Sequence, residues 1–105
     1  MNDKFLSLLG IAKKAGKLCS GHDAVKEAVR GDKAKLVIFT GDSSERLREE
    51  FRKMQENKEI KTIYTEYTMT DICRATSGKA AVMCVTESGF AQRLTELFGE
   101  KHKEV

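Results

Sequence analysis

Apolar residues recur with a helical period in five stretches of the chain. In the first stretch, Phe5, Leu9 and Ala12 lie at positions i, i+4 and i+7, the spacing of one face of an amphipathic helix. Polar and charged residues fill the positions between them, as on the exposed side of such a helix. The pattern predicts five helices, over residues 3–15, 21–30, 43–57 and 68–77 and from residue 88 onward.

Short apolar runs between these helices predict strands. The runs 36–39 and 81–85 are apolar throughout, which is typical of central strands covered on both faces. Further strands are expected at 17–19 and 62–65, which completes the order αβαβαβαβα. Buried strands that alternate with helices favour a sheet between two helical layers. We therefore predict an α/β fold, a single-domain three-layer α/β/α sandwich with a four-stranded mixed sheet, spanning 1–105 with a core over 3–98 and a tail over 99–105.

Polar residues ahead of the apolar stripes indicate where the helices begin. In a capping box, a side chain at the helix start accepts a hydrogen bond from an amide three residues on. Three pairs have this spacing: Ser20 with Asp23, Asp42 with Glu45, and Thr68 with Asp71. Ser88 is expected to cap the last helix, and Gly16 to end the first one.

Composition places the chain among ordinary globular proteins. Its 105 residues are 40% hydrophobic, and no apolar run approaches the roughly 20 residues of a membrane helix. The N-terminal residues lack the layout of a signal peptide, so we expect a cytoplasmic monomer without membrane contact. The three cysteines, at 19, 73 and 84, form no C-x-x-C pair, and we expect neither disulfides nor a metal site nor a cofactor. Cys73 and Cys84 are expected to pack as small apolar residues.

The net charge of +3 is unevenly distributed. Residues 1–40 contain eight Lys/Arg against four Asp/Glu, so this part carries +4 and the remainder −1. A basic segment is compatible with a phosphate-bearing partner, and equally with a solvated lysine-rich surface. The many charges of the helix predicted at 43–57 are interpreted as a solvent face with ion pairs one turn apart, not as a binding stripe.

Enzymatic motifs are weak in this sequence. Cys19 and His22 are three residues apart and could form a thiolate–imidazole pair with Asp23 as the orienting group, but such proximity is common by chance. No glycine-rich phosphate loop or dinucleotide fingerprint is present. We therefore predict that the protein is not an enzyme and has no catalytic residues.

The best candidate for a binding site is the basic, glycine-flanked stretch 13–23, which runs directly into the second helix. Gly16 and Gly21 permit close approach of a ligand to the backbone, and the free amides at the helix start favour a phosphate. Lys13, Lys14 and Lys17 would add attraction that weakens with salt. The alternative interpretation is structural, with the glycines making turns and Ser20 capping the helix.

Several of these segments resemble the L7Ae/L30e ribosomal protein family of kink-turn RNA binders, most closely its bacterial YlxQ-type branch. The resemblance covers roughly residues 6–97. It is carried by the segments Gly16-Lys17-x-x-x-Gly21, Lys33-Ala34-Lys35-Leu36-Val37-Ile38, Ala75-Thr76-Ser77-Gly78-Lys79 and Val85-Thr86-Glu87-Ser88-Gly89-Phe90-Ala91-Gln92. It implies an α/β/α sandwich that contacts RNA with the loop and start of the second helix, assisted by the loop before the last strand.

The sequence departs from this family at the residues that contact the kink-turn. Family members place Asn-Glu or Lys-Gln, and often a Lys one turn later, where this chain has Asp23, Ala24 and Glu27. The absence of each charge-assisted hydrogen bond costs about 1.5–3 kcal/mol. We therefore expect binding to structured RNA, ribosomal RNA above all, with altered specificity and with the ribosome as a candidate partner.

The predicted RNA-binding residues come from the basic loop, the start of the second helix and the loop before the last strand. They are Lys13, Lys14, Lys17, Ser20, Gly21, His22, Asp23, Lys26 and Lys79. His22 is a candidate for stacking on an exposed base, or else a neutral surface residue. The alternative function is a protein–protein adaptor that has kept the fold and lost kink-turn recognition, which Asp23 and Glu27 favour.

Overall fold

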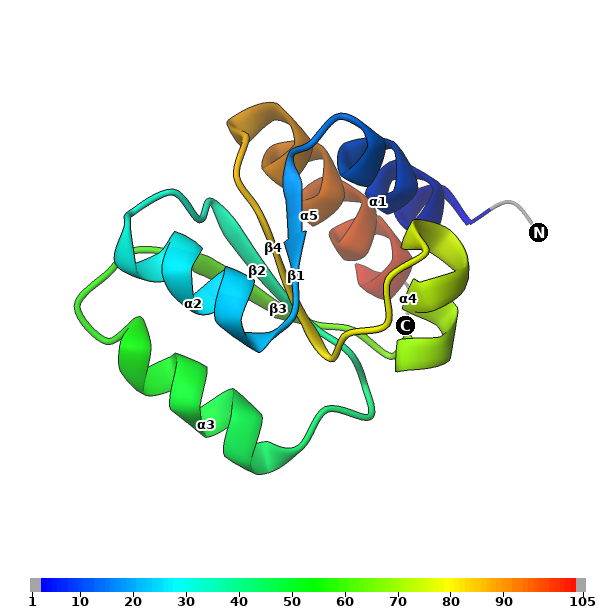
Figure 1. Ribbon diagram of the computed structural model, residues 1–105. Helices are drawn as coiled ribbons and strands as arrows, with labels where there is room; N and C mark the ends of the chain where they lie inside the picture. Colours follow the sequence, from blue (N-terminus) through cyan, green and yellow to red (C-terminus); the bar gives the residue numbers. More distant parts are fainter. Residues whose placement is uncertain (1–2, 104–105) are drawn as a thin grey trace.

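The computed structural model describes residues 3–103, with side chains described through residue 99. Five helices alternate with four strands, in the predicted order (Figure 1). The helices are α1 (Lys4–Lys14), α2 (His22–Arg30), α3 (Glu45–Met54), α4 (Met69–Thr76) and α5 (Ser88–Lys103). The strands are β1 (Leu18–Ser20), β2 (Leu36–Phe39), β3 (Lys61–Tyr64) and β4 (Val82–Val85). The predicted tail covers residues 99–105. Side chains are described only as far as residue 99, and the backbone of α5 is helical through Lys103.

The four strands form one mixed sheet in the order β1-β4-β2-β3. β2 pairs in parallel with β3, whereas β4 is antiparallel to both β1 and β2. The carboxyl ends of β1, β2 and β3 therefore lie at the same edge of the sheet as the start of β4. Two backbone bonds tie this edge together, from Gly21 N–H to the Val82 carbonyl (2.9 Å) and from Thr40 N–H to the Ala81 carbonyl (3.0 Å). We call it the α2 edge, because α2 begins there.

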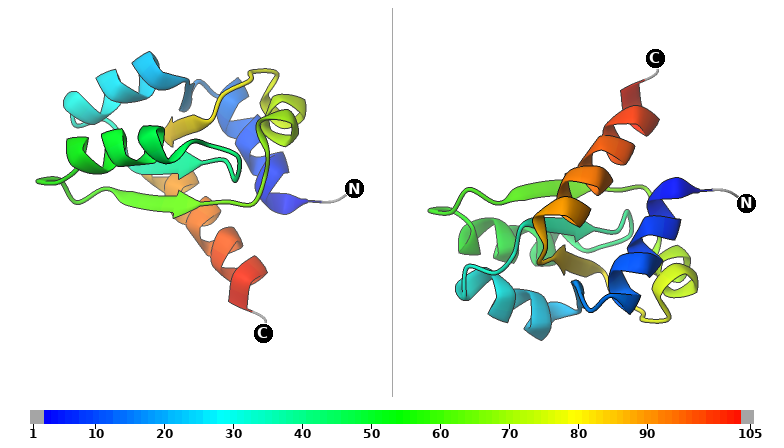
Figure 2. Two further views of the ribbon diagram at one scale, coloured as in Figure 1. Left: turned by 90° about the horizontal axis from the view of Figure 1, so that it is seen from below. Right: turned by 90° about the horizontal axis from the view of Figure 1, so that it is seen from above.

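Helices cover both faces of the sheet, which confirms the three-layer sandwich. Helices α2 and α3 lie on one face, and α1, α4 and α5 lie on the other (Figure 2). Alternate residues of β2 point into opposite cores: Val37 and Phe39 pack with α2 and α3, while Leu36 and Ile38 pack with α1 and α5. All residues of β2 and β4 are buried, as expected from their continuous apolar runs. No helix in residues 3–103 is long and apolar enough to span a membrane.

The helix starts confirm one predicted capping box and correct the other assignments. Thr68 and Asp71 form the complete box at α4. Helix α3 begins two residues later than predicted and is capped by Ser44, because the Asp42 carboxylate instead accepts a bond from the Met69 amide at α4 (3.1 Å). At α5, the Glu87 carboxylate accepts the Phe90 amide (2.8 Å), so the capping carboxylate precedes Ser88, the first helical residue.

The Ser20–Asp23 box was predicted wrongly. Gly21 occupies the N-cap position of α2 with φ 97° and makes no side-chain cap bond. Ser20 is still in β1, and its hydroxyl is buried without a hydrogen-bond partner in the described residues. The positive φ explains the glycine, since other residues rarely adopt this conformation.

Candidate RNA interface

The α2 edge presents unpaired backbone donors. In the described structure, the first intrahelical bond of α2 runs from the Val25 amide to the Gly21 carbonyl, and the amides of His22, Asp23 and Ala24 have no protein acceptor. A carboxylate or hydroxyl oxygen bonds an amide at the start of each of the other four helices. Helix α2 therefore keeps its partial positive end available to an external anion.

Space around Gly21 is open. A Cβ atom at this position would meet nothing within 4 Å, so the glycine is required by its φ and not by a close neighbour. Gly16 has the same properties, with φ 74° and open space. Gly16 and Gly21 both have a positive φ, which confirms that each forms a turn as predicted. Because the space around them is open, their backbone is accessible to a ligand.

The loop before β4 lies next to the α2 edge. Residues 77–81 connect α4 to β4, which begins beside Gly21 and Thr40. The pKa of the Asp42 carboxyl is lowered chiefly by the nearby Thr40 hydroxyl, then by backbone amides such as that of Met69, and to the smallest extent by the charge of Lys79. Lys13 reaches from α1 toward this loop, since a Cβ at Gly78 would lie 3.7 Å from its Nζ. Lys79 in this loop and Lys13 beside it therefore place two cations here.

Lys17 lies apart from this group. It precedes β1, and its carbonyl accepts the Thr86 amide (3.0 Å) at the opposite edge of the sheet from Gly21. Its charge acts there on the carboxylate of Glu87, whose pKa is lowered mainly by the amides of Phe90 and Gly89. Lys14 is exposed at the end of α1, in the turn that leads to Lys17. Lys17 is close to α2 along the chain. In the structure, however, the length of β1 separates Lys17 from the start of α2.

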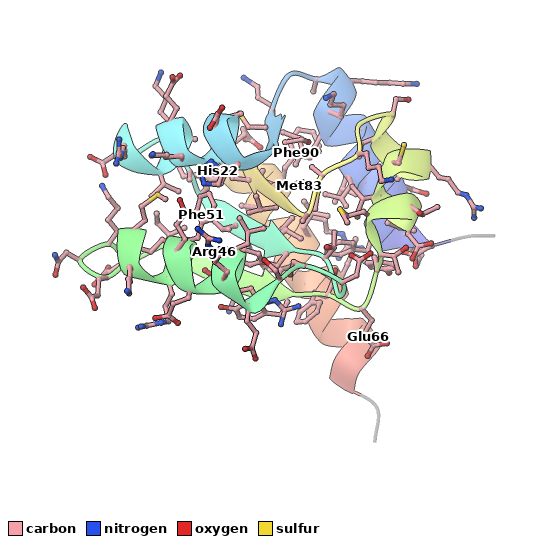
Figure 3. The ribbon with its side chains drawn as sticks, turned by 60° about the horizontal axis from the view of Figure 1, so that its bottom comes forward. His22, Arg46, Phe51, Glu66, Met83 and Phe90 are labelled. Atoms are coloured by element: carbon pink, nitrogen blue, oxygen red, sulfur yellow. The ribbon has the colours of Figure 1, made fainter. Side chains whose placement is uncertain are left out.

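His22 contacts α3. Its Nε2 lies 2.7 Å from the Glu50 carboxylate and its Nδ1 lies 3.1 Å from Asp23. Its ring also meets the Phe51 ring edge-on, with centroids 5.5 Å apart, in the space between α2 and α3 (Figure 3). Hydrogen bonds to Asp23 and then Glu50 raise the pKa of His22 above its usual value near 6.5. The ring is therefore held against α3, not presented as a free platform for a base.

The same contacts separate His22 from Cys19. Both imidazole nitrogens bond carboxylates, so the geometry provides no thiolate–imidazole pair. Cys19 instead lies directly opposite Cys84 on the neighbouring strand β4. Burial raises the pKa of the Cys84 thiol to about 12, so this thiol stays protonated. Cys84 is buried as predicted, whereas Cys73 is only half-buried.

The positions that depart from the kink-turn binders are at the surface of α2. The Asp23 side chain is fully exposed at the helix start. Ala24 and Glu27 are also exposed. The accessible face at this point therefore combines free amides with two carboxylates.

Charges on α2 and α3 meet along the seam between the two helices. Helix α2 directs His22, Lys26 and Arg30 toward α3, at positions i, i+4 and i+8. Helix α3 contributes Arg46, Glu50 and Lys53, at i, i+4 and i+7. Sequence reasoning identified Lys26 but missed the other three cations, because nothing in the sequence states that α3 packs beside α2.

Comparison with known proteins matches residues 3–95 to the ribosomal protein L7Ae/L30e/S12e/Gadd45 family. The chain belongs to this family. It is 32% identical over 96 residues to the RNA-binding protein YlxQ of Bacillus subtilis (90% of this chain, 94% of that protein). It is 27% identical over 94 residues to the RNA-binding protein YlxQ of Enterococcus faecium (90% of each).

Solved structures share the architecture. A protein of unknown function from Bacillus halodurans superimposes with a TM-score of 0.83 at 27% identity, covering 91% of this chain and 97% of that one. A 15.5 kD RNA binding protein of Giardia lamblia superimposes with a TM-score of 0.73, covering 95% and 89%. At 18% identity the latter likeness concerns the fold alone.

Proposed function

We propose that this protein binds structured RNA through the α2 edge, with the free amides of α2 as the central anion-binding group. The observation that carries the proposal is the uncapped start of α2, where three successive amides have no acceptor among the described residues. Family membership supports it, as do two relatives named RNA-binding proteins. Proteins read RNA mainly at irregular, bent or single-stranded sites, and ribosomal RNA is rich in such sites.

Lysines around the edge provide the electrostatic part of binding. Lys79 in the loop before β4, Lys13 beside that loop and Lys26 on α2 can contact phosphates near the free amides. Such contacts release counterions, so affinity falls as salt rises. Lys14 and Lys17 act at longer range, from the turn that follows α1.

Kink-turn RNA is the ligand class to test first, with weakened affinity expected. Asp23 and Glu27 bring negative charge toward a polyanion, and Ala24 offers no hydrogen bond. The substitutions Asp23→Asn, Ala24→Glu and Glu27→Lys together restore the family's residues and make this helix start more positive, because two carboxylates are removed, one is added and a lysine is gained. We expect this triple variant to bind a kink-turn hairpin more tightly than the unmodified protein does, by at least tenfold, the equivalent of about 1.4 kcal/mol.

The test is a filter-binding titration of the kink-turn hairpin and of total ribosomal RNA over a salt series. Lys79→Gln should weaken binding and make the salt dependence shallower. Lys35→Gln is the matched control, because Lys35 is exposed at the opposite edge, before β2. Absence of binding by the unmodified protein even at low salt would refute the proposal.

A protein–protein adaptor is the second candidate, favoured by the full exposure of Asp23 at the helix start. An adaptor of this kind would present Asp23 and Glu27 to a basic protein partner. In that case the unmodified protein would bind neither RNA, even at low salt.

A further inference from the structure

Cations outnumber carboxylates along the seam between α2 and α3. The seam forms an open groove of about 700 Å³ lined by Lys26, Arg30, Arg46, Glu49, Glu50, Lys53 and Met54. Four of these side chains are cationic and two are carboxylates. Exposed charges of one sign that line a groove raise the local concentration of the opposite charge.

Both groove carboxylates have other partners. Glu50 bonds His22 at 2.7 Å, and Glu49 bonds the Arg52 guanidinium, whose Nε lies 3.1 Å away. No carboxylate in the described residues lies within ion-pair distance of any of the four cations. The charge of Lys53 does contribute to lowering the pKa of Glu49, after the larger effect of Arg52.

The like charges in this groove repel one another. Lys26 and Arg30 are one turn apart on α2, and like charges at this spacing destabilise a helix by a few tenths of a kcal/mol. Arg46 and Lys53 add like charge from the facing helix. A bound polyanion would convert this repulsion into attraction.

The seam also continues from the α2 edge. His22, the first residue of α2, bonds Glu50, which lines the groove, and Arg30, the last residue of α2, lines it as well. Asp23 and Glu27 do not line it. A strand that meets the free amides of α2 therefore finds cations along the seam and carboxylates on the outer face of the helix.

We propose that the α2–α3 groove is a second RNA-contacting surface, in which Lys26, Arg30, Arg46 and Lys53 bind the phosphodiester backbone. This inference rests on the proposed function and extends the interface from the α2 edge onto α3. The bases would remain outside the groove, so its contribution is independent of sequence. It gives the protein a source of affinity that the altered kink-turn positions do not supply.

The test measures salt dependence of binding by fluorescence anisotropy, with a labelled kink-turn hairpin and a labelled single-stranded poly(U) as probes. Replacing Arg46 and Lys53 by Gln removes two charges and keeps helix propensity. We expect the slope of log affinity against log salt to become shallower by about 0.7–0.9 for each phosphate that the variant no longer neutralises. Replacing Lys26 and Arg30 by Gln should have the same effect from the α2 side.

The control is Lys4→Gln with Arg74→Gln, which removes the same charge from α1 and α4 on the other face of the sheet. This variant should keep the slope of the unmodified protein, and circular dichroism should show native folding in all three. If the unmodified protein binds RNA and both groove variants keep its slope, the groove inference is wrong while the proposed function stands.

Two other outcomes are informative. Failure of the unmodified protein to bind either probe at about 50 mM salt would overturn the proposed function, and the groove inference with it. The second outcome concerns a poly-glutamate peptide. If this peptide binds the unmodified protein as tightly as RNA does and does not bind the groove variants, the groove is a site for an acidic protein and the inference is overturned.

Discussion

Replacing Gly10 by alanine should destabilise the protein, although such a change usually stabilises a helix. Glycine in a helix interior costs about 0.5–1 kcal/mol relative to alanine. Gly10 lies in the middle of α1, where α1 packs against α4, and a Cβ there would lie 2.7 Å from the Ala75 carbonyl oxygen. Ordinary van der Waals contact begins near 3.4 Å, so one of the two helices must shift. Overpacking of this kind costs about 1–3 kcal/mol.

Gly99 provides the matched comparison. It is also helical, in α5, and a Cβ there would meet nothing within 4 Å. Gly99→Ala should therefore raise the free energy of unfolding by up to about 0.5–1 kcal/mol. The difference between the two variants isolates the clash, because the gain in helix propensity is similar in both. We expect Gly10→Ala to be less stable than Gly99→Ala by about 1–3 kcal/mol.

Urea unfolding at equilibrium measures this difference directly. Each kcal/mol of lost stability lowers the melting temperature of a domain of about 100 residues by about 4–8 °C. Equal stabilisation by both substitutions would show that α1 and α4 are not in the close contact described, and would refute the reasoning.

Three further predictions concern His22, Cys84 and Thr68. The raised pKa of His22 means that the stability contributed by its charged form, through its bonds to Asp23 and then Glu50, is fully present below pH 6.5 and is lost as pH rises through the folded-state pKa. NMR titration of Glu50→Gln should show a lower His22 pKa, and an unchanged value would contradict the pairing. With a pKa of about 12, Cys84 should resist alkylation at pH 8 in the folded protein and react after denaturation, which mass spectrometry can follow. Thr68→Ala should cost about 1 kcal/mol in urea unfolding through loss of the capping box, whereas no loss would exclude a stabilising cap.

Much of the fold can be predicted from the sequence because the apolar period is clear. The run Leu36-Val37-Ile38-Phe39 coincides with β2, and the stripe Leu47, Phe51 and Met54 faces the core from α3. The helix starts are less predictable, because several polar residues compete for each cap. Asp42 accepts a hydrogen bond from the Met69 amide at α4, and Ser44 caps α3 instead.

The candidate site is predictable only in part. Gly21 stands out in the sequence, and its backbone conformation agrees with a turn that opens onto α2. The strand order is not encoded locally, so nothing in the sequence places Lys17 at the far edge or His22 against Glu50. In the sequence, the charges of α3 have the pattern of an ordinary solvent face. Arg46 and Lys53 line a groove with Lys26 and Arg30 only because α3 packs beside α2.

The most direct test of the central claim is an NMR titration of the ¹⁵N-labelled protein with a kink-turn hairpin. The account predicts that the amide resonances of His22, Asp23 and Ala24 shift most at low salt, because these donors have no acceptor in the part of the chain that the structure describes. Shifts confined to the α1, α4 and α5 face, or no shifts at all, would contradict it.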